Sequence, residues 1–124
     1  MILDTFCLAL VVYVEARGEE IDGQLLVAET VINRQQDEGY PDDLCGVAFD
    51  HKQFSGVNDE IDLQAMFTDP AWETSILVAE DALSGNLIGS GATHYHTTTS
   101  KPYWSEDLIL LGMYGNHIFY KDHE

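Results

Sequence analysis

The chain has 124 residues, of which 45% are hydrophobic, so it is long and apolar enough to form one folded domain over residues 1–124. Its 22 acidic residues against 5 lysines and arginines give a formal net charge of −17, which repels nucleic-acid phosphates and argues against a DNA or RNA partner. No apolar run reaches the roughly 18 residues that a membrane-spanning helix needs, so we expect no membrane insertion.

The first predicted element is a helix from Phe6 to about Ala16. Either Asp4 or Thr5 can cap its start, and Gly18 is a natural stop after its end. This helix holds the longest apolar run of the chain. Because that run is apolar on all sides, we expect the helix to lie at the centre of the core.

Two more helices are predicted further along the chain. The segment QLLVAETVINRQQ has apolar residues at helical spacing, and the segment DEGYPDD breaks that pattern. Residues 44–68 show no clear period, and we predict that they are irregular. Asp69 as a cap and Pro70 as the first residue then predict a third helix, which ends before Gly85.

The last third of the chain predicts a small sheet. The segments THYHTTT and HIFYK are typical of strands, and SEDLILLG between them predicts a short helix. With helices first and an antiparallel strand pair after them, the predicted fold is an α+β domain.

Cys7 and Cys45 are the only two cysteines, which is too few for a disulfide framework. They could pair if the fold brought them together, but we expect two free, buried thiols.

One carboxylate stands at the end of the apolar helix. Burial and the negative end of the helix dipole both favour the protonated form of Glu15, whereas Glu19 lies near the start of the next helix, where the dipole favours ionisation. Two nearby carboxyls in opposed environments suit acid–base chemistry at neutral pH. The alternative is a structural ion pair between Glu15 and Arg17 or Arg34.

Three later clusters combine polar and aromatic side chains. The segment QFSG supplies Gln53 and Ser55, and ATHYH places His94 and His96 on one face of a strand and Tyr95 on the other. The segment GNHIFY adds a third histidine and two aromatic rings. Such groups suit a sugar-binding surface, because sugar rings stack on aromatic rings and hydroxyls need polar partners. Alternatively, the aromatic rings are ordinary core residues.

A zinc site is a second interpretation of the histidines. His94 and His96 share a strand face, and His117 could add a third ligand. The pattern is weak, since strand histidines more often hydrogen-bond the backbone, so we expect no metal.

Six motifs occur together in one order: YVEARGEEIDGQLLVAETVINR, YPDDLCGVAF, QFSG, ATHYH, PYW and GNHIFY. With these motifs the chain resembles the cell wall hydrolase family of spore cortex-lytic enzymes, from about Leu8 to Tyr120. The resemblance implies a mainly helical, lysozyme-like catalytic domain with a small antiparallel sheet. It also implies cleavage of peptidoglycan glycan strands without any cofactor.

The resemblance also assigns roles to residues. Glu15, the first glutamate of the EARGE motif, would be the catalytic acid of a lytic transglycosylase. A hydrolytic muramidase with the same site and a non-catalytic glycan-binding module remain alternatives. Gln24 and Asn33 are expected to be internal polar ties. The residues expected to contact the glycan are Glu19, Gln53, Ser55, His94, Tyr95, His96 and Trp104.

The start of the chain, MILDTF, carries no basic group ahead of the apolar run, so we expect no signal peptide. The chain would then be made in the cytoplasm and act on the cell wall as a monomer. Release during phage lysis and action on a spore cortex both fit this expectation. The net charge is unfavourable for approach to an anionic wall at low salt.

Overall fold

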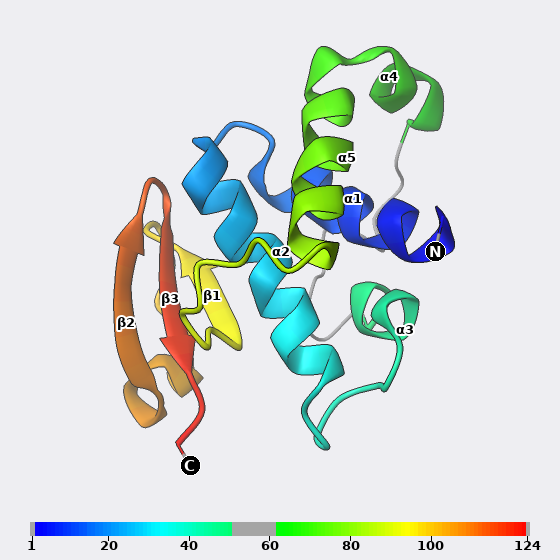
Figure 1. Ribbon diagram of the computed structural model, residues 1–124. Helices are drawn as coiled ribbons and strands as arrows, with labels where there is room; N and C mark the ends of the chain where they lie inside the picture. The colour runs from blue at the N-terminus through cyan, green and yellow to red at the C-terminus, as the bar shows by residue number, and fades with distance from the viewer. Residues whose placement is uncertain (1, 51–61, 124) are drawn as a thin grey trace.

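The computed structural model describes residues 2–50 and 62–123, and it places a small sheet beside a group of helices (Figure 1). Helices come first along the chain and strands last, so the expected mainly helical α+β class is confirmed. The elements are α1 (Ile2–Ala16), α2 (Ile21–Gln35), α3 (Leu44–Ala48), α4 (Leu63–Thr68), α5 (Pro70–Leu83), β1 (His94–Thr97), the 3₁₀ helix Tyr103–Asp107, β2 (Ile109–Tyr114) and β3 (His117–Lys121).

The first helix is the centre of the core, as its apolar sequence predicts. Every residue from Cys7 to Tyr13 is at most 8% exposed, and α1 packs against α2, α3 and α5. The helix begins at Ile2 rather than near Phe6, so Asp4 lies inside its first turn instead of capping it. A carboxylate in the first turn is favourable because it faces the positive end of the helix dipole. Among the described residues, no helix is long and apolar enough to cross a membrane.

The start of α5 follows its sequence closely. Asp69 is the cap and accepts a 2.9 Å hydrogen bond from the backbone N–H of Ala71, while Pro70 is the first helical residue. The other oxygen of Asp69 accepts a 2.8 Å hydrogen bond from the hydroxyl of Tyr13. The same carboxylate therefore caps α5 and fixes it against α1.

The prediction that residues 44–68 are irregular was wrong for both ends of that segment. They form α3 and α4, which are only five and six residues long. Each begins with an aspartate cap, because Asp43 accepts from the N–H of Gly46 and Asp62 accepts from the N–H of Ala65. Helices this short carry no periodic signal and depend on their caps and on packing.

The sheet has three strands in the order β1-β3-β2, and both pairings are antiparallel. The expected pairing of β1 with β3 is confirmed, with Tyr95 opposite Phe119. The short helix predicted for SEDLILLG was right only for its start, because residues 105–107 lie in the 3₁₀ helix, whereas residues 109–112 belong to β2, which pairs with β3. As an edge strand, β2 leaves Leu110 and Met113 64% and 65% exposed.

Polar side chains on α2 hold the chain that leads into β1. Glu29 is 1% exposed, and its carboxylate accepts hydrogen bonds from the N–H groups of Gly89 and Ser90 and from the Ser90 hydroxyl. Asn33 and Arg34 donate to the two carbonyl groups that directly precede β1. Asn33 is therefore the internal tie that the sequence predicts.

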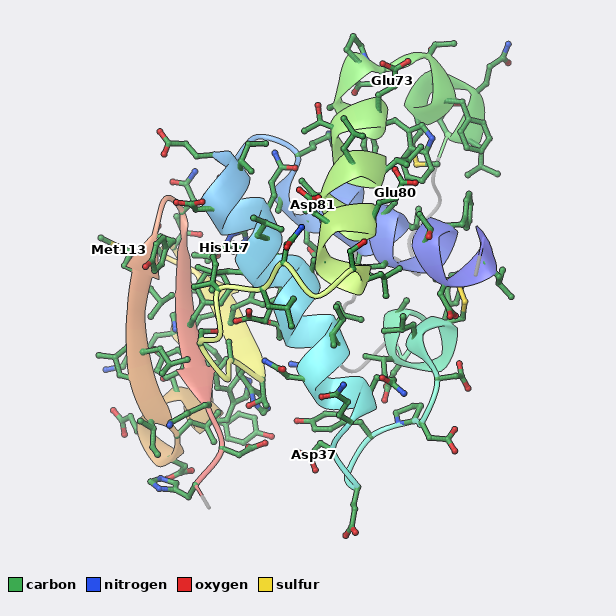
Figure 2. All side chains as sticks on the ribbon, in the orientation of Figure 1. Asp37, Glu73, Glu80, Asp81, Met113 and His117 are labelled. Carbon is green, nitrogen blue, oxygen red and sulfur yellow. A yellow bond between two sulfur atoms is a disulfide. The ribbon has the colours of Figure 1, made fainter. Side chains whose placement is uncertain are left out.

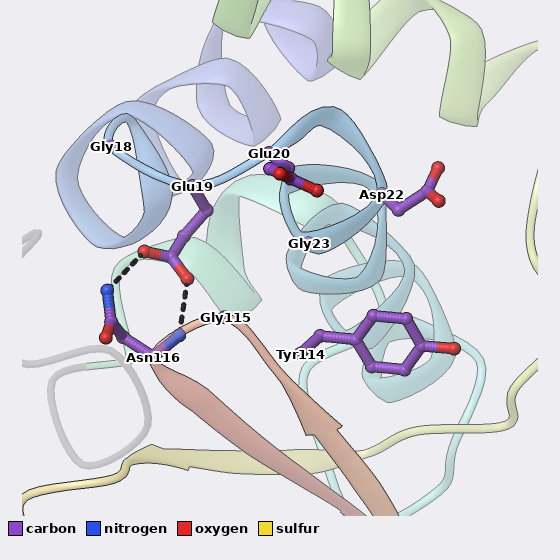
Figure 3. Close-up of a pocket in the computed structure, with 8 residues that line it drawn as sticks. All are labelled: Gly18, Glu19, Glu20, Asp22, Gly23, Tyr114, Gly115 and Asn116. Atoms are coloured by element: carbon purple, nitrogen blue, oxygen red, sulfur yellow. Dashed lines mark hydrogen bonds between the residues drawn. The ribbon is translucent and has the colours of Figure 1, made fainter.

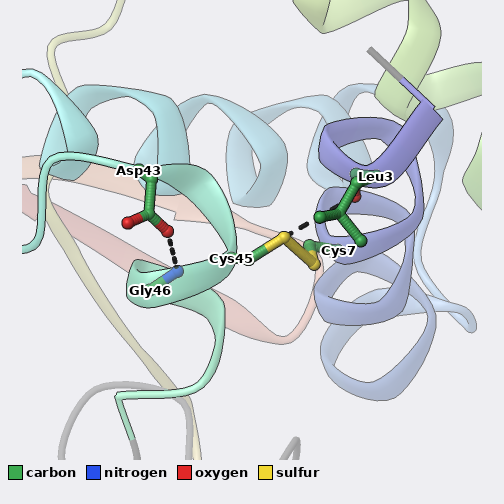
Figure 4. The surroundings of a disulfide bond; sticks show 5 residues. All are labelled: Leu3, Cys7, Asp43, Cys45 and Gly46. Carbon is green, nitrogen blue, oxygen red and sulfur yellow. Dashed lines mark hydrogen bonds between the residues drawn. A yellow bond between two sulfur atoms is a disulfide. The ribbon is translucent and has the colours of Figure 1, made fainter.

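Cys7 of α1 and Cys45 of α3 form a disulfide (Figure 4), so the expectation of two free thiols was wrong. The two residues are 38 positions apart, and their Cα atoms lie 5.2 Å from each other. Sequence alone could not bring them together, because α3 is too short to be predicted and its packing on α1 is a tertiary contact.

Removing this disulfide is expected to lower the free energy of unfolding by about 4 kcal/mol, because a cross-link over 38 positions restricts the unfolded chain. Urea denaturation of the wild type and of a Cys7→Ala, Cys45→Ala double variant measures the difference. A reductant should lower the Tm of the wild type and leave that of the double variant unchanged. An equal response of both chains would contradict the cross-link.

Candidate active site

The candidate acid Glu15 lies in the last turn of α1, where it is half-buried. The hydroxyl of Tyr95, on β1, is shielded from solvent and lies near enough to Glu15 to be affected by its charge. Burial raises the pKa of Tyr95 well above its usual value, and the negative charge of Glu15 raises it further. The structure thus brings together an acid and a neutral hydroxyl from two distant segments.

Two aromatic neighbours on β3 hold the Tyr95 ring. The ring of His117 meets it edge to face at 5.0 Å between centroids, and Phe119 packs at 5.6 Å. Phe119 is 1% exposed and belongs to the core. The side of the sheet that carries Tyr95 therefore faces the helices.

Glu19 follows α1 and reaches across to the turn between β2 and β3. Its carboxylate accepts 2.7 Å and 3.0 Å hydrogen bonds from the backbone and side-chain N–H groups of Asn116 (Figure 3). The backbone hydrogen bond is the main cause that lowers the pKa of Glu19. The lowered pKa agrees with the expected ionised state of Glu19, and hydrogen bonds from Asn116 favour that state.

His117 lies next to this carboxylate. Its Nδ1 atom is 3.8 Å from Glu19 Oε1, and the two side chains are 5% and 9% exposed. Burial lowers the pKa of His117, although the negative charge of Glu19 opposes this effect. A neutral imidazole therefore separates the Glu19 carboxylate from the Tyr95 ring.

A cavity of about 310 Å³ opens beside Glu19 (Figure 3). It lies between the start of α2 and the turn from β2 to β3, and its wall combines carboxylates, glycines and one aromatic ring. The lining residues are Gly18, Glu19, Glu20, Asp22, Gly23, Tyr114, Gly115 and Asn116.

The alternative of an ion pair between Glu15 and an arginine stays open, and the two candidate arginines have other contacts as well. Arg17 is the nearer of the two in sequence. Its guanidinium donates a 3.0 Å hydrogen bond to the carbonyl of Tyr13 and lies 4.6 Å from the centre of that ring. Arg34, the other candidate, donates to the carbonyl of Thr93 and lies over the ring of Tyr40.

Three predicted glycan contacts lie on the opposite face of the sheet. His94 and His96 both pack against Trp104, at 5.1 Å and 5.7 Å between ring centroids. Met113 shares their face, and Figure 2 shows it on the far side of the sheet from His117. The structure therefore groups Glu15, Glu19 and Tyr95 but does not bring the other three to them. Their glycan contact stays a prediction, and Gln53 and Ser55 lie outside the described residues.

The arrangement of the histidines gives no support to a zinc site. His94 and His96 hydrogen-bond the hydroxyls of Tyr40 and Tyr120, whereas His117 lies on the other face. In the described part of the chain, no three histidine, cysteine or carboxylate side chains are placed to hold a metal ion.

Comparison with known proteins decides the family. A family model described as Cell Wall Hydrolase matches residues 18–120, which is most of the chain. The chain belongs to the cell wall hydrolase family. It is 37% identical over 119 residues to a spore cortex-lytic enzyme of Halalkalibacterium halodurans and 33% identical over 119 residues to one of Bacillus subtilis. The matches cover 94% of this chain but only 34% and 37% of those relatives.

Two solved structures share the fold. One is the catalytic domain of the germination-specific lytic transglycosylase SleB from Bacillus anthracis, with a TM-score of 0.76 and 30% identity over 95% of this chain and 93% of that domain. The other is the catalytic domain of Bacillus cereus SleB, with a TM-score of 0.76 and 26% identity over 98% and 91%. The chain therefore matches a cell wall hydrolase over one catalytic domain.

The family model covers only part of the candidate site. Glu19, Tyr95 and Asn116 lie inside residues 18–120, whereas Glu15 lies three positions before that range. Sequence reasoning missed Asn116, although it stands in the quoted motif GNHIFY. Its neighbours in that motif, a histidine and two aromatic residues, carried the prediction instead.

Gly115→Ala is expected to destabilise this cell wall hydrolase by about 1–3 kcal/mol. Gly115 has φ +57°, and a Cβ atom there would collide with the Glu19 carboxylate. Thermal or urea unfolding measures the loss. Gly39→Ala is the matched control, because the only atom near its added Cβ is 3.8 Å away, and it should change stability by less than about 0.5 kcal/mol. Equal stability of the two variants would contradict the close approach of Glu19.

Glu19→Gln is expected to lower stability by about 1–2 kcal/mol at neutral pH, because charged hydrogen bonds to Asn116 are weakened. A pKa lowered by folding contributes stability above the unfolded pKa and loses it as pH falls through the folded pKa. The difference between the two chains should therefore shrink in acid. Denaturation over a pH series tests this, and the exposed neighbour variant Glu20→Gln should follow the wild type throughout.

Proposed function

We propose that this chain cleaves the glycan strands of peptidoglycan between N-acetylmuramic acid and N-acetylglucosamine. The observation that carries the proposal is a half-buried Glu15 beside a neutral hydroxyl, in a domain similar over nearly its whole length to a lytic transglycosylase catalytic domain. A carboxyl in such a place can hold a proton near neutral pH and release it to a substrate.

Glu15 is the general acid of the proposed reaction. Its proton passes to the glycosidic oxygen as the bond to the muramoyl C1 breaks, so the leaving sugar departs with a free hydroxyl. The ionised Glu15 then takes the proton of the muramoyl 6-hydroxyl while that oxygen bonds to C1. The products are a shortened strand and a 1,6-anhydromuramoyl end, and Glu15 regains its proton.

A second catalytic carboxylate is not needed, because the acetamido group of the substrate can stabilise the positive centre at C1. The surroundings of Glu19 support this single-carboxyl mechanism. Its carboxylate is 9% exposed and already accepts two hydrogen bonds from Asn116, so it is poorly placed to activate a water molecule. We propose that Glu19 instead fixes the turn between β2 and β3 beside the site.

The alternatives differ in their products. A hydrolytic muramidase with the same acid would leave reducing muramoyl ends, and a glycan-binding module would release no products. The position of Glu15 beside Tyr95 favours a catalytic role over simple binding. We propose that the enzyme works as a monomer without cofactor, either on spore cortex, as the names of its relatives suggest, or in phage lysis.

Glu15→Gln is expected to lower the rate of glycan cleavage by about 10²- to 10⁴-fold, because an amide cannot donate the proton. Mass spectrometry of soluble products from purified peptidoglycan, at low and high salt, measures the effect. Glu73→Gln, on the exposed face of α5, is the matched control and should keep wild-type activity. Anhydromuropeptides from the wild type and the control alone would support the transglycosylase.

Other products would overturn parts of this proposal. Muropeptides with reducing ends would identify a muramidase that uses the same acid. Intact glycan with cut peptides would exclude the role of Glu15, and activity lost with a chelator would indicate a metal-dependent amidase. Binding without any product would leave only the glycan-binding module.

A further inference from the structure

The sheet and the segments that connect its strands carry little of the negative charge of the chain. Between Asp81 and Asp122, a stretch that contains all three strands, the only acidic residues are Glu106 and Asp107. The carboxylate of Glu106 lies 3.4 Å from the ammonium group of Lys101, which offsets one of these charges. The sheet is therefore the least acidic part of a protein whose formal net charge is −17.

The side of the sheet opposite to the helices exposes apolar side chains. This outer sheet face is formed by residues of all three strands, namely His94, His96, Leu110, Met113, Ile118 and Tyr120. Leu110 and Met113 are 64% and 65% exposed. They share this face although they are three positions apart, because the pairing of β2 with β3 shifts register between Leu110 and Gly112. The shift therefore places two large apolar side chains together in solvent.

The ring of Trp104 packs on the outer sheet face. Its centroid lies 5.1 Å, 5.7 Å and 5.6 Å from those of His94, His96 and Tyr120. The side chain is only half-buried, so part of it still meets solvent. A ring that its neighbours already fix loses little conformational entropy when a ligand binds. Trp104 is therefore suited to stacking against a sugar ring.

A row of hydroxyl groups continues from the end of β1. Residues 97–100 are three threonines and a serine, and all four are exposed. The hydroxyl of Thr97 lies 3.1 Å from that of Thr99 and 3.4 Å from that of Ser100. Because a hydroxyl both donates and accepts, this row can pair with sugar hydroxyls and with carboxylates without adding a charge.

We propose that the outer sheet face, together with Trp104 and the hydroxyls of residues 97–100, is a second binding surface for the glycan strands of peptidoglycan. It is separate from Glu15, because α1 and the other helices lie on the opposite side of the sheet (Figure 1). The inference rests on the proposed substrate and not on the proposed cleavage. The surface would hold the protein on an insoluble wall while Glu15 acts on a strand.

The chemistry of the strand fits this face better than any other side of the molecule. Peptidoglycan is anionic, so it is repelled least where the protein has the fewest carboxylates. Its sugar rings and acetyl methyl groups offer apolar surface to Trp104, Leu110 and Met113. A second copy of the chain is a less favourable occupant, because it brings the same net charge of −17 to the encounter.

Met113→Glu tests the inference by placing a carboxylate on the outer sheet face. Leu77→Glu is the matched control, because Leu77 is 64% exposed on α5 and the substitution changes the net charge equally. Both are made in a Glu15→Gln chain, so that binding to insoluble peptidoglycan is measured without cleavage. Met113→Glu should raise the half-saturating concentration about 5- to 10-fold, and Leu77→Glu should not change it. Equal binding of the two variants would overturn the proposal.

The salt dependence of binding gives a second readout. The contacts of the outer sheet face are mostly uncharged, whereas the protein as a whole repels an anionic wall. Raising the salt concentration from about 0.02 M to about 0.2 M screens that repulsion and should strengthen binding. Weaker binding at the higher concentration would indicate capture by opposite charges and would contradict the proposal.

Cleavage assays in the chain that keeps Glu15 separate this inference from the proposed function. Met113→Glu should slow the digestion of whole sacculi more than the digestion of soluble glycan fragments. An equal loss on both substrates would place this face in the reaction site and overturn a separate surface. A wild type that binds sacculi through this face but cleaves neither substrate would reject the proposed cleavage alone.

Two further checks keep the test decisive. Size-exclusion chromatography follows the oligomeric state, and a dimer that Met113→Glu dissociates would identify a second copy as the occupant and overturn the glycan assignment. Urea denaturation shows whether the variants fold. If Met113→Glu does not, Leu110→Ser removes apolar surface from the same face without adding a charge, with Leu77→Ser as its control. Equal binding of that pair would overturn the proposal.

Discussion

The arrangement of this molecule depends on one buried carboxylate, Glu29, in the middle of α2. A buried charge is costly unless donors surround it, and Glu29 has two backbone N–H groups and a hydroxyl from residues 89 and 90. Asn33 and Arg34, one turn further along α2, continue the same row of contacts to the residues just before β1. The contacts of Glu29, Asn33 and Arg34 fix the position of β1 along α2. Tyr95 of β1 therefore lies near the end of α1, which carries Glu15.

The sheet then separates two kinds of surroundings. On the side toward the helices, Tyr95, His117 and Phe119 pack against the core. Glu15, in the last turn of α1, and Glu19, just after α1, lie on this side. On the other side, His94, His96 and Trp104 form an aromatic group with Tyr120. Alternation along β1 is therefore the reason that neighbouring residues of the motif ATHYH have different surroundings. The cluster near Glu15 is small, and it is assembled from α1, the turn after it, β1 and β3.

The elements with a strong local signal could be predicted from the sequence. These signals are the apolar run of α1, the Asp69 cap and Pro70 at the start of α5, and the alternation of residues along β1. The short helices α3 and α4 and the strand β2 were missed, because caps and pairing with β3 outweigh their local pattern. The alternation showed that Tyr95 and His94 point to opposite sides, but only tertiary packing decides which side meets Glu15. The disulfide was missed for the same reason.

The position of β3 between its two partners leaves the sheet with edges on β1 and β2, and β2 carries Leu110 and Met113 in exposed positions. Such an edge can pair with the same edge of another copy, which is a common route to aggregation. The net charge of −17 opposes that encounter, because two copies repel each other before their edges meet. The acidity of the surface therefore opposes association of copies, and this effect weakens in concentrated salt and near pH 4, where carboxylates take up protons.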